Sequence, residues 1–210
     1  MIALIDYGAG NLTSVRKAFA AIGADVFVPA APDDLERATG VVVPGVGHFD
    51  ATRVLHGAWT DAILARLGEG RPLFGICLGM QWLFEGSDEA PDVPGLGVLG
   101  GQCVRLQTIA KDAGATSEPH QRIKIPHVGW NALDVRSAAS IVDGVAAGTQ
   151  VYFTHSYAAP ITGDTVAVTD HGMPFAAIVQ RGQVAGVQFH PEKSGEVGLR
   201  MLRNFVQLAG

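Results

Sequence analysis

Two hydrophobic periods alternate over the first 85 of the 210 residues, and this alternation constrains the fold more than any other feature. Short unbroken apolar runs lie at 2–6, 26–28, 41–43 and 73–76, and helical patterns lie between them at 12–22, 59–67 and 78–84. Strands that are apolar throughout must be buried on both faces. Strands that alternate with helices pair in parallel. The pattern therefore predicts an α/β fold with a mostly parallel central sheet and helices on both faces.

The second half of the chain has a different texture. Residues 87–101 are rich in Pro, Gly and Asp and predict a connection, and 111–121 is polar and predicts a surface loop. Further strands are expected at 104–106, 151–154, 166–169, 176–180 and 184–189, the last two forming a hairpin across 181–183. A closing helix is expected over 194–208, with Ser194 as its N-cap. We therefore expect antiparallel additions to the sheet and a single domain over 1–210.

Composition excludes several classes of protein. Apolar residues make up 48% and charged residues 17%, which excludes a disordered chain. The net charge of -5 argues against a nucleic-acid partner. The most apolar stretch, 72–84, is too short for a membrane span of roughly 20 residues, and the N-terminus does not read as a secretory signal. We therefore expect no membrane association.

The two cysteines, Cys77 and Cys103, are too few for a disulfide framework, which favours a reducing cytoplasm. Their spacing does not suggest a metal site. The Gly8-Ala9-Gly10 turn lacks the third glycine of a dinucleotide fingerprint, because Thr13 stands there, and there is no Walker loop. We expect neither a metal nor a cofactor.

The segment Gly75-Ile76-Cys77-Leu78-Gly79 lies between a predicted strand and a predicted helix. A nucleophile placed on such a sharp turn is exposed at the carboxyl end of the sheet, and the flanking glycines remove side chains that would collide. The helix start would also favour the thiolate. A small buried cysteine in a glycine-rich turn would give the same pattern, so the segment alone does not decide.

A thiol nucleophile needs a base, and His190 has the best context of the seven histidines. It ends an apolar strand, at the edge where Cys77 is expected, and Glu192 follows two residues later. A carboxylate there can orient one imidazole nitrogen and leave the other for the thiol. Without Cys77, a strand-end histidine before a Pro turn would be the simpler interpretation.

Acyl transfer also requires donors for an oxyanion. The amide of Leu78, directly after the nucleophile, is the first candidate. An amide from Gly45, Val46 or Gly47, in the loop after the strand at 41–43, is the second. Alone, this glycine-rich loop would be interpreted as a plain turn.

Together, the motifs Gly75-Ile76-Cys77-Leu78-Gly79-Met80-Gln81 and His190-Pro191-Glu192 resemble those of the class I, or triad, glutamine amidotransferases, whose core is flavodoxin-like. The segments 6–11, 44–47, 127–131, 155–157 and 188–194 look like the branch formed by the glutaminase subunits of imidazole glycerol phosphate synthase. The similarity covers nearly the whole chain apart from 108–122.

The resemblance implies that Cys77 attacks the carboxamide of glutamine and forms a glutamyl thioester. His190 would protonate the leaving ammonia and then activate water, with Glu192 orienting it. Gln81 would hold the α-amino and α-carboxylate end of glutamine, helped by main-chain groups of Ser156 and Tyr157. Ammonia would pass to a (β/α)₈ cyclase partner in a heterodimer, which makes imidazole glycerol phosphate and an aminoimidazole carboxamide ribotide in histidine biosynthesis.

Three other interpretations stay open. A glutaminase serving anthranilate, aminodeoxychorismate or pyridoxal phosphate synthesis fits the triad, but not the 44–47 and 127–131 segments. A redox or non-catalytic module would have no use for His190 and Glu192. A thiol esterase or peptidase shares the triad logic and would be separated by assaying simple esters against glutamine.

Overall fold

The fold is built on one eight-stranded sheet, which we describe from a computed structural model covering residues 1–107 and 123–210. Its strand order is β2-β1-β3-β4-β13-β12-β11-β8. The five strands from β2 to β13 run in parallel, and β12, β11 and β8 continue the sheet antiparallel. The strands are β1 (Ile2–Leu4), β2 (Val26–Phe27), β3 (Gly40–Val43), β4 (Leu73–Ile76), β8 (Asp134–Val135), β11 (Thr165–Asp170), β12 (Pro174–Arg181) and β13 (Val184–Val187).

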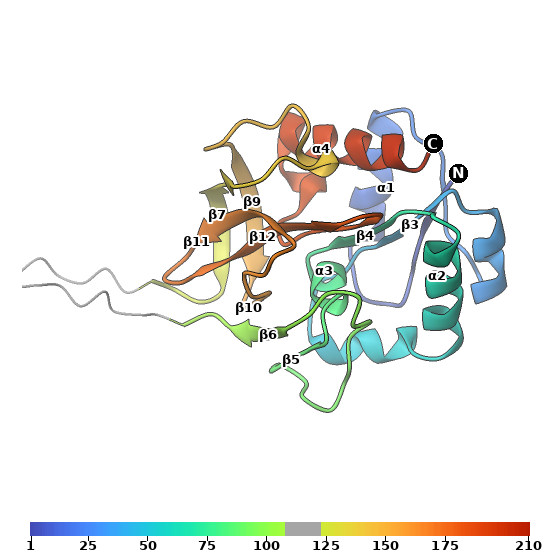
Figure 1. Cartoon of the computed structure of the whole chain (residues 1–210), viewed down its shortest axis with the longest axis horizontal. Helices are drawn as coiled ribbons and strands as arrows, with labels where there is room; N and C mark the ends of the chain where they lie inside the picture. The colour runs from blue at the N-terminus through green and yellow to red at the C-terminus, as the bar shows by residue number, and fades with distance from the viewer. Residues whose placement is uncertain (108–122) are drawn as a thin grey trace, which may run out of the picture.

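Helices cover the sheet on both faces (Figure 1). One face carries α1 (Leu12–Ala21) and α4 (Gly195–Leu208), which also contact each other. The other carries α2 (Ala58–Gly68) and the short α3 (Leu78–Trp82). Short 3₁₀ turns lie at Pro32–Arg37, Phe49–Leu55, Ser140–Val142 and Pro191–Lys193.

Successive residues of the central strands point into two different cores. On β4, Phe74 and Ile76 join the core under α1 and α4, whereas Leu73 joins the one under α2 and α3. Phe74 stacks on Phe205 of α4, with ring centroids 5.1 Å apart. Because side chains alternate across a strand, a strand covered on both faces must be apolar at every position. The expected parallel core with helices on both faces is confirmed.

Two smaller sheets flank the antiparallel half of the molecule. One pairs β10 (Tyr157–Ala158) with β6 (Gln102–Arg105) and β5 (Gly86–Ser87), and the other pairs β7 (His127–Ala132) with β9 (Gln150–His155). The hairpin across 181–183 is present, with Arg181 opposite Val184. The loop expected at 111–121 lies outside the described residues. No helix in the described part of the chain is long and apolar enough to cross a membrane.

Ser194 is the N-cap residue of the closing helix, as expected from the sequence. The helix begins at Gly195, but the side chain of Ser194 does not cap it. Instead the Ser194 hydroxyl donates to the His190 carbonyl across 2.7 Å and accepts from the Tyr152 amide across 3.0 Å. Ser194 therefore fixes the backbone of His190 against β9.

Candidate active site

Cys77 occupies a strained turn between β4 and α3. Its φ is +52°, and it is the one non-glycine residue in the described parts of the chain with a positive φ. Such a conformation costs free energy for an L-residue and persists only when the surrounding structure enforces it. The amide of Cys77 donates to Val187 of the neighbouring strand across 2.8 Å, and Gln81 donates back to the Cys77 carbonyl. The turn therefore fixes the sulfur at the carboxyl end of the sheet.

The two glycines flanking Cys77 are required by close backbone approaches. A Cβ on Gly79 would lie 1.8 Å from the carbonyl oxygen of Val43. A Cβ on Gly75 would lie 2.6 Å from the carbonyl oxygen of Gly79. The helix that follows has only five residues, so its dipole contributes less to the thiolate than expected.

His190 and Glu192 form a buried pair beside this turn. Glu192 Oε1 accepts from His190 Nδ1 across 2.8 Å, and both side chains are 2% exposed. This contact leaves Nε2 free, and Nε2 has no hydrogen-bond partner among the described residues. Burial would lower the pKa of His190, but the neighbouring Cys77 and Glu192 outweigh burial and raise the pKa to about 10. The arrangement favours a protonated imidazole beside the sulfur.

Two glutamine side chains connect Cys77 to β10. Gln188 donates to the sulfur of Cys77 across 3.7 Å and accepts from Gln81 across 3.1 Å. Gln81 also donates to the carbonyl of Tyr157 across 2.8 Å. Sequence reasoning gave Gln188 no role, although its amide is a direct neighbour of the thiol. This contact helps to fix the position of the sulfur.

The sulfur opens onto a small polar cavity of about 200 Å³, which has room for roughly seven water molecules. It is lined by Gly47, Cys77, Leu78, Gln81, Glu89, Pro126, Thr154, His155, Ser156 and Tyr157. The structure thus brings Gln81, Ser156 and Tyr157 together with Cys77, as expected. The carbonyl of Ser156 already accepts from Leu106, so it is held in place.

Glu89 is a residue of this cavity that sequence reasoning missed. Its carboxylate accepts from the amide of Phe49 across 2.8 Å and faces the cavity that contains Cys77. The residue belongs to the connection after α3, which has no periodic pattern. No local sequence signal therefore separates Glu89 from the other carboxylates of this connection.

A directed chain of hydrogen bonds runs behind the cavity. His155 Nδ1 donates to the Tyr157 carbonyl across 2.9 Å, so His155 Nε2 must accept. His127 Nδ1 then donates to it across 3.1 Å, and Asn131 donates to His127 Nε2 across 3.2 Å. Burial lowers the pKa of His127 to about 4 and that of His155 to about 3. Both rings are therefore neutral near pH 7 and connect β7 to the segment that lines the cavity.

The first candidate oxyanion donor, the amide of Leu78, is paired with a protein group in this structure. The Leu78 amide donates to the Gly45 carbonyl across 3.3 Å. Gly47 lines the cavity and has a φ of +110°, which favours glycine. At Gly45 the need for glycine is steric, because a Cβ there would lie 2.0 Å from the Tyr7 hydroxyl. The loop therefore turns a carbonyl, not an amide, toward Leu78.

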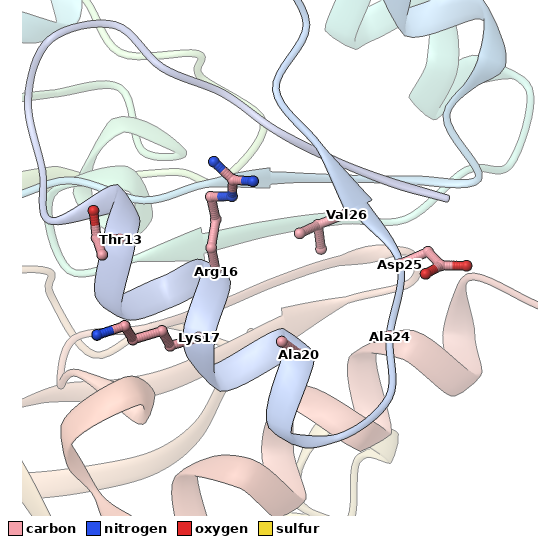
Figure 2. A pocket seen from close by; sticks show the side chains of 7 residues that line it. All are labelled: Thr13, Arg16, Lys17, Ala20, Ala24, Asp25 and Val26. Atoms are coloured by element: carbon pink, nitrogen blue, oxygen red, sulfur yellow. The ribbon is translucent and has the colours of Figure 1, made fainter.

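Neither the second cysteine nor a larger hollow offers a comparable site. Cys103 is buried in β6, and burial raises the pKa of its thiol, which stays protonated. A hollow of about 430 Å³ lies beside α1 and β2, and Figure 2 shows the side chains that line it. It is lined by Thr13, Arg16, Lys17, Ala20, Ala24, Asp25 and Val26, with no cysteine, serine or histidine. The expected nucleophile, Cys77, lines the smaller cavity instead.

Comparison with known proteins agrees with this geometry. Residues 3–208 match the family model described as "Glutamine amidotransferase class-I". A solved structure described as a glutamine amidotransferase superposes with a TM-score of 0.74 at 21% identity, covering all of both chains. PurLQS from Thermotoga maritima superposes with a TM-score of 0.73 at 17% identity, over 98% of this chain and 97% of that one. These two likenesses show the fold. The chain therefore belongs to the class I glutamine amidotransferases.

The most similar relatives that we compared all belong to one branch of this class. "Imidazole glycerol phosphate synthase subunit HisH" of Natronomonas pharaonis is 45% identical over 98% of this chain and 93% of its own. The subunit of the same name in Geobacillus kaustophilus is 44% identical over 100% and 97%. That of Methanothermobacter thermautotrophicus is 41% identical over 99% and 98%. Within the class, the chain belongs to the HisH family.

Proposed function

We propose that the chain hydrolyses glutamine through Cys77, His190 and Glu192 and delivers the ammonia to a cyclase partner. The observation that carries this proposal is the constrained sulfur of Cys77 beside an imidazole whose other nitrogen is held by Glu192 across 2.8 Å. Membership of the HisH family supports glutamine as the substrate.

In the first half-reaction the Cys77 thiolate attacks the carboxamide carbon of glutamine and gives a tetrahedral oxyanion. When the C–N bond breaks, the departing nitrogen takes the proton of the His190 imidazolium and leaves as ammonia. The product is a glutamyl thioester. His190, now neutral, removes a proton from water, whose oxygen attacks the thioester. Glutamate leaves, and the sulfur and the imidazolium are restored.

Glutamine binding is assigned to the lining of the cavity. The carboxylate of Glu89 faces the space beyond the sulfur, where it would pair with the α-ammonium group. The side chain of Gln81 and main-chain groups of Ser156 and Tyr157 would hold the rest of the amino-acid end. Because Gln81 is itself held by Tyr157 and Gln188, its position is fixed before substrate arrives.

The oxyanion donors would become available through a reversal of the 45–46 peptide. Reversal would turn the Gly45 carbonyl away and free the Leu78 amide, while the Val46 amide would turn inward. Both donors would therefore appear in one movement. Loss of one such donor costs about 10²–10³ in rate, so the arrangement seen here corresponds to a slow enzyme.

The partner would be the (β/α)₈ cyclase subunit, with one copy of each chain in a heterodimer. Exposed apolar side chains next to the site support a partner surface, since Val128 is 58% exposed and Trp130 57%. Both lie on β7, two strand positions apart and therefore on one face. The turn over 7–11 is a second candidate contact. We place this complex in the cytoplasm.

The Cys77→Ala variant tests the proposal. In a complex with the cyclase, it should abolish glutamine-dependent synthesis and leave ammonia-dependent synthesis intact. Cys103→Ala is the matched control, because Cys103 is buried and does not line the cavity, and it should retain both activities. A normal glutamine-dependent rate in Cys77→Ala would overturn the proposal, as would hydrolysis of simple esters in preference to glutamine.

A further inference from the structure

Tyr7 presents a buried donor that the mechanism above does not use. The residue follows β1, its side chain is 7% exposed, and its hydroxyl has no hydrogen-bond partner in the described part of the chain. A buried hydroxyl without a partner is unfavourable and needs an explanation. Burial and the nearby charge of Cys77 raise the pKa of the phenol, so it remains a donor.

The hydroxyl lies against the loop that would provide the oxyanion donor. A Cβ on Gly45 would come within 2.0 Å of the Tyr7 oxygen and 3.0 Å of the Leu78 Cβ. The phenol is therefore in contact with the α-carbon of Gly45, on the side that also faces Leu78. Gly10, in the turn after Tyr7, lies near the same residue, since its Cβ would be 3.5 Å from the Gly45 α-carbon.

The hydrogen bonds of this region differ between the two loop arrangements. In the arrangement seen here the Gly45 carbonyl accepts from Leu78, and the Tyr7 hydroxyl is unpaired. After reversal of the 45–46 peptide the carbonyl loses that donor. A buried carbonyl needs another donor, and Tyr7 is the unpaired buried donor beside it.

We propose that Tyr7 is a positioning residue that stabilises the reversed 45–46 peptide by donating its hydroxyl hydrogen to the Gly45 carbonyl. The inference rests on the proposed glutaminase function and adds to it. Tyr7 does not touch glutamine in this account. It offsets the loss of the bond between Leu78 and Gly45, and so increases the population of the arrangement with two oxyanion donors.

The test uses Tyr7→Phe in the complete complex with its nucleotide ligand bound. Because the variant removes one hydrogen bond from the reversed arrangement only, kcat for glutamine hydrolysis should fall about fivefold to tenfold while KM stays unchanged. Ammonia-dependent synthesis should be unaffected. The thermal midpoint of the isolated chain should not fall, because the hydroxyl has no partner in the resting arrangement. A purely structural role would lower the midpoint and leave kcat unchanged.

A double-mutant cycle with Val46→Pro sharpens the test. Val46→Pro removes one of the two donors that reversal would deliver, so the gain from reversal shrinks and the loss caused by Tyr7→Phe should be smaller in that background. An equal loss in both backgrounds, or a wild-type kcat in Tyr7→Phe, would overturn the inference while leaving the glutaminase function intact. A wild-type complex that does not hydrolyse glutamine would overturn the function itself.

Discussion

The amide of Leu78 donates its hydrogen to the carbonyl oxygen of Gly45 across 3.3 Å. Leu78 directly follows the nucleophile, and Gly45 lies in the loop after β3, so the two candidate sides of an oxyanion site bind each other. While this hydrogen bond is made, the Leu78 amide cannot donate to an oxyanion, so a negative charge on the substrate oxygen would be costly to form. We interpret it as the resting arrangement of the site.

Replacement of the base should cost more than replacement of its orienting partner. His190→Asn should lower glutamine turnover about 10²–10⁴-fold, because the proton carrier is removed. Glu192→Gln should cost less, since an amide oxygen can still accept from Nδ1 and the backbone of His190 is held by Ser194. Steady-state kinetics of the complex measure both. A larger loss in Glu192→Gln would require the two roles to be exchanged.

Glu89→Gln should weaken glutamine binding. The variant removes the negative charge that faces the cavity but keeps an oxygen for the Phe49 amide, so KM should rise about tenfold or more. Glu85→Gln is the matched control, because Glu85 is exposed and accepts from Gly101 outside the cavity. Equal KM values in the two variants would remove Glu89 from the binding site.

The glycine after the nucleophile should tolerate no side chain. Gly79→Ala places a methyl group 1.8 Å from the Val43 carbonyl, so the backbone of β3 or α3 must move. We expect a loss of more than about 3 kcal/mol in the free energy of unfolding. Gly68→Ala, at the end of α2, meets nothing within 4 Å and should stabilise the chain by up to about 1 kcal/mol. Denaturant unfolding compares the two. Similar stabilities would show that the turn can relax.

Stability should fall as the pH is lowered from about 6.5 to about 4. His127 and His155 have depressed pKa values, about 4 and 3, so in this range the unfolded chain binds protons that the folded chain does not. Each such proton contributes a slope of about 1.4 kcal/mol per pH unit. The pKa of His190 is raised, so its protonation stabilises the folded chain. This contribution is fully present below pH 6.5 and therefore does not add to the loss of stability in this range. His127→Asn should reduce the dependence of stability on pH. An unchanged pH dependence would contradict the conclusion that the His127 and His155 rings are neutral in the folded protein.

The first half of the fold follows closely from local patterns. The apolar runs at 41–43 and 73–76 became β3 and β4, because a strand buried on both faces carries its signal within a few residues. The strand β7 was not expected, since His127–Ala132 mixes glycine, histidine and exposed apolar residues. Its pairing with β9 depends on residues some twenty positions away, and no local period records that.

For the site as well, contacts between residues close in sequence could be predicted, and contacts made by tertiary folding could not. The glycines around Cys77 and the contact between His190 and Glu192 depend on neighbours in sequence, and the structure contains both. Glu89 reaches the cavity, and Gln188 reaches the sulfur of Cys77, only through tertiary folding. The Ser194 hydroxyl binds His190 and Tyr152 instead of an amide of the closing helix, and its contact with Tyr152 has the same origin. Nothing in the sequence indicates which peptide orientation the 45–46 loop takes.

The oxyanion loop is best locked at Val46. A proline at Gly45 would bring a Cβ into the Tyr7 hydroxyl, so failure of that variant would not be informative. Val46 is 37% exposed, and proline there removes the amide with less disturbance of the core.

The most direct test is glutamine hydrolysis by the isolated chain, by the complex with the cyclase, and by the complex with its nucleotide ligand. The contact between Leu78 and Gly45 predicts a slow isolated chain and a rise of about 10²–10³ once the loaded partner favours the reversed peptide. Val46→Pro should hold the loaded complex near the slow rate. Equal turnover in all three states, or full activity of Val46→Pro in the loaded complex, would contradict the account.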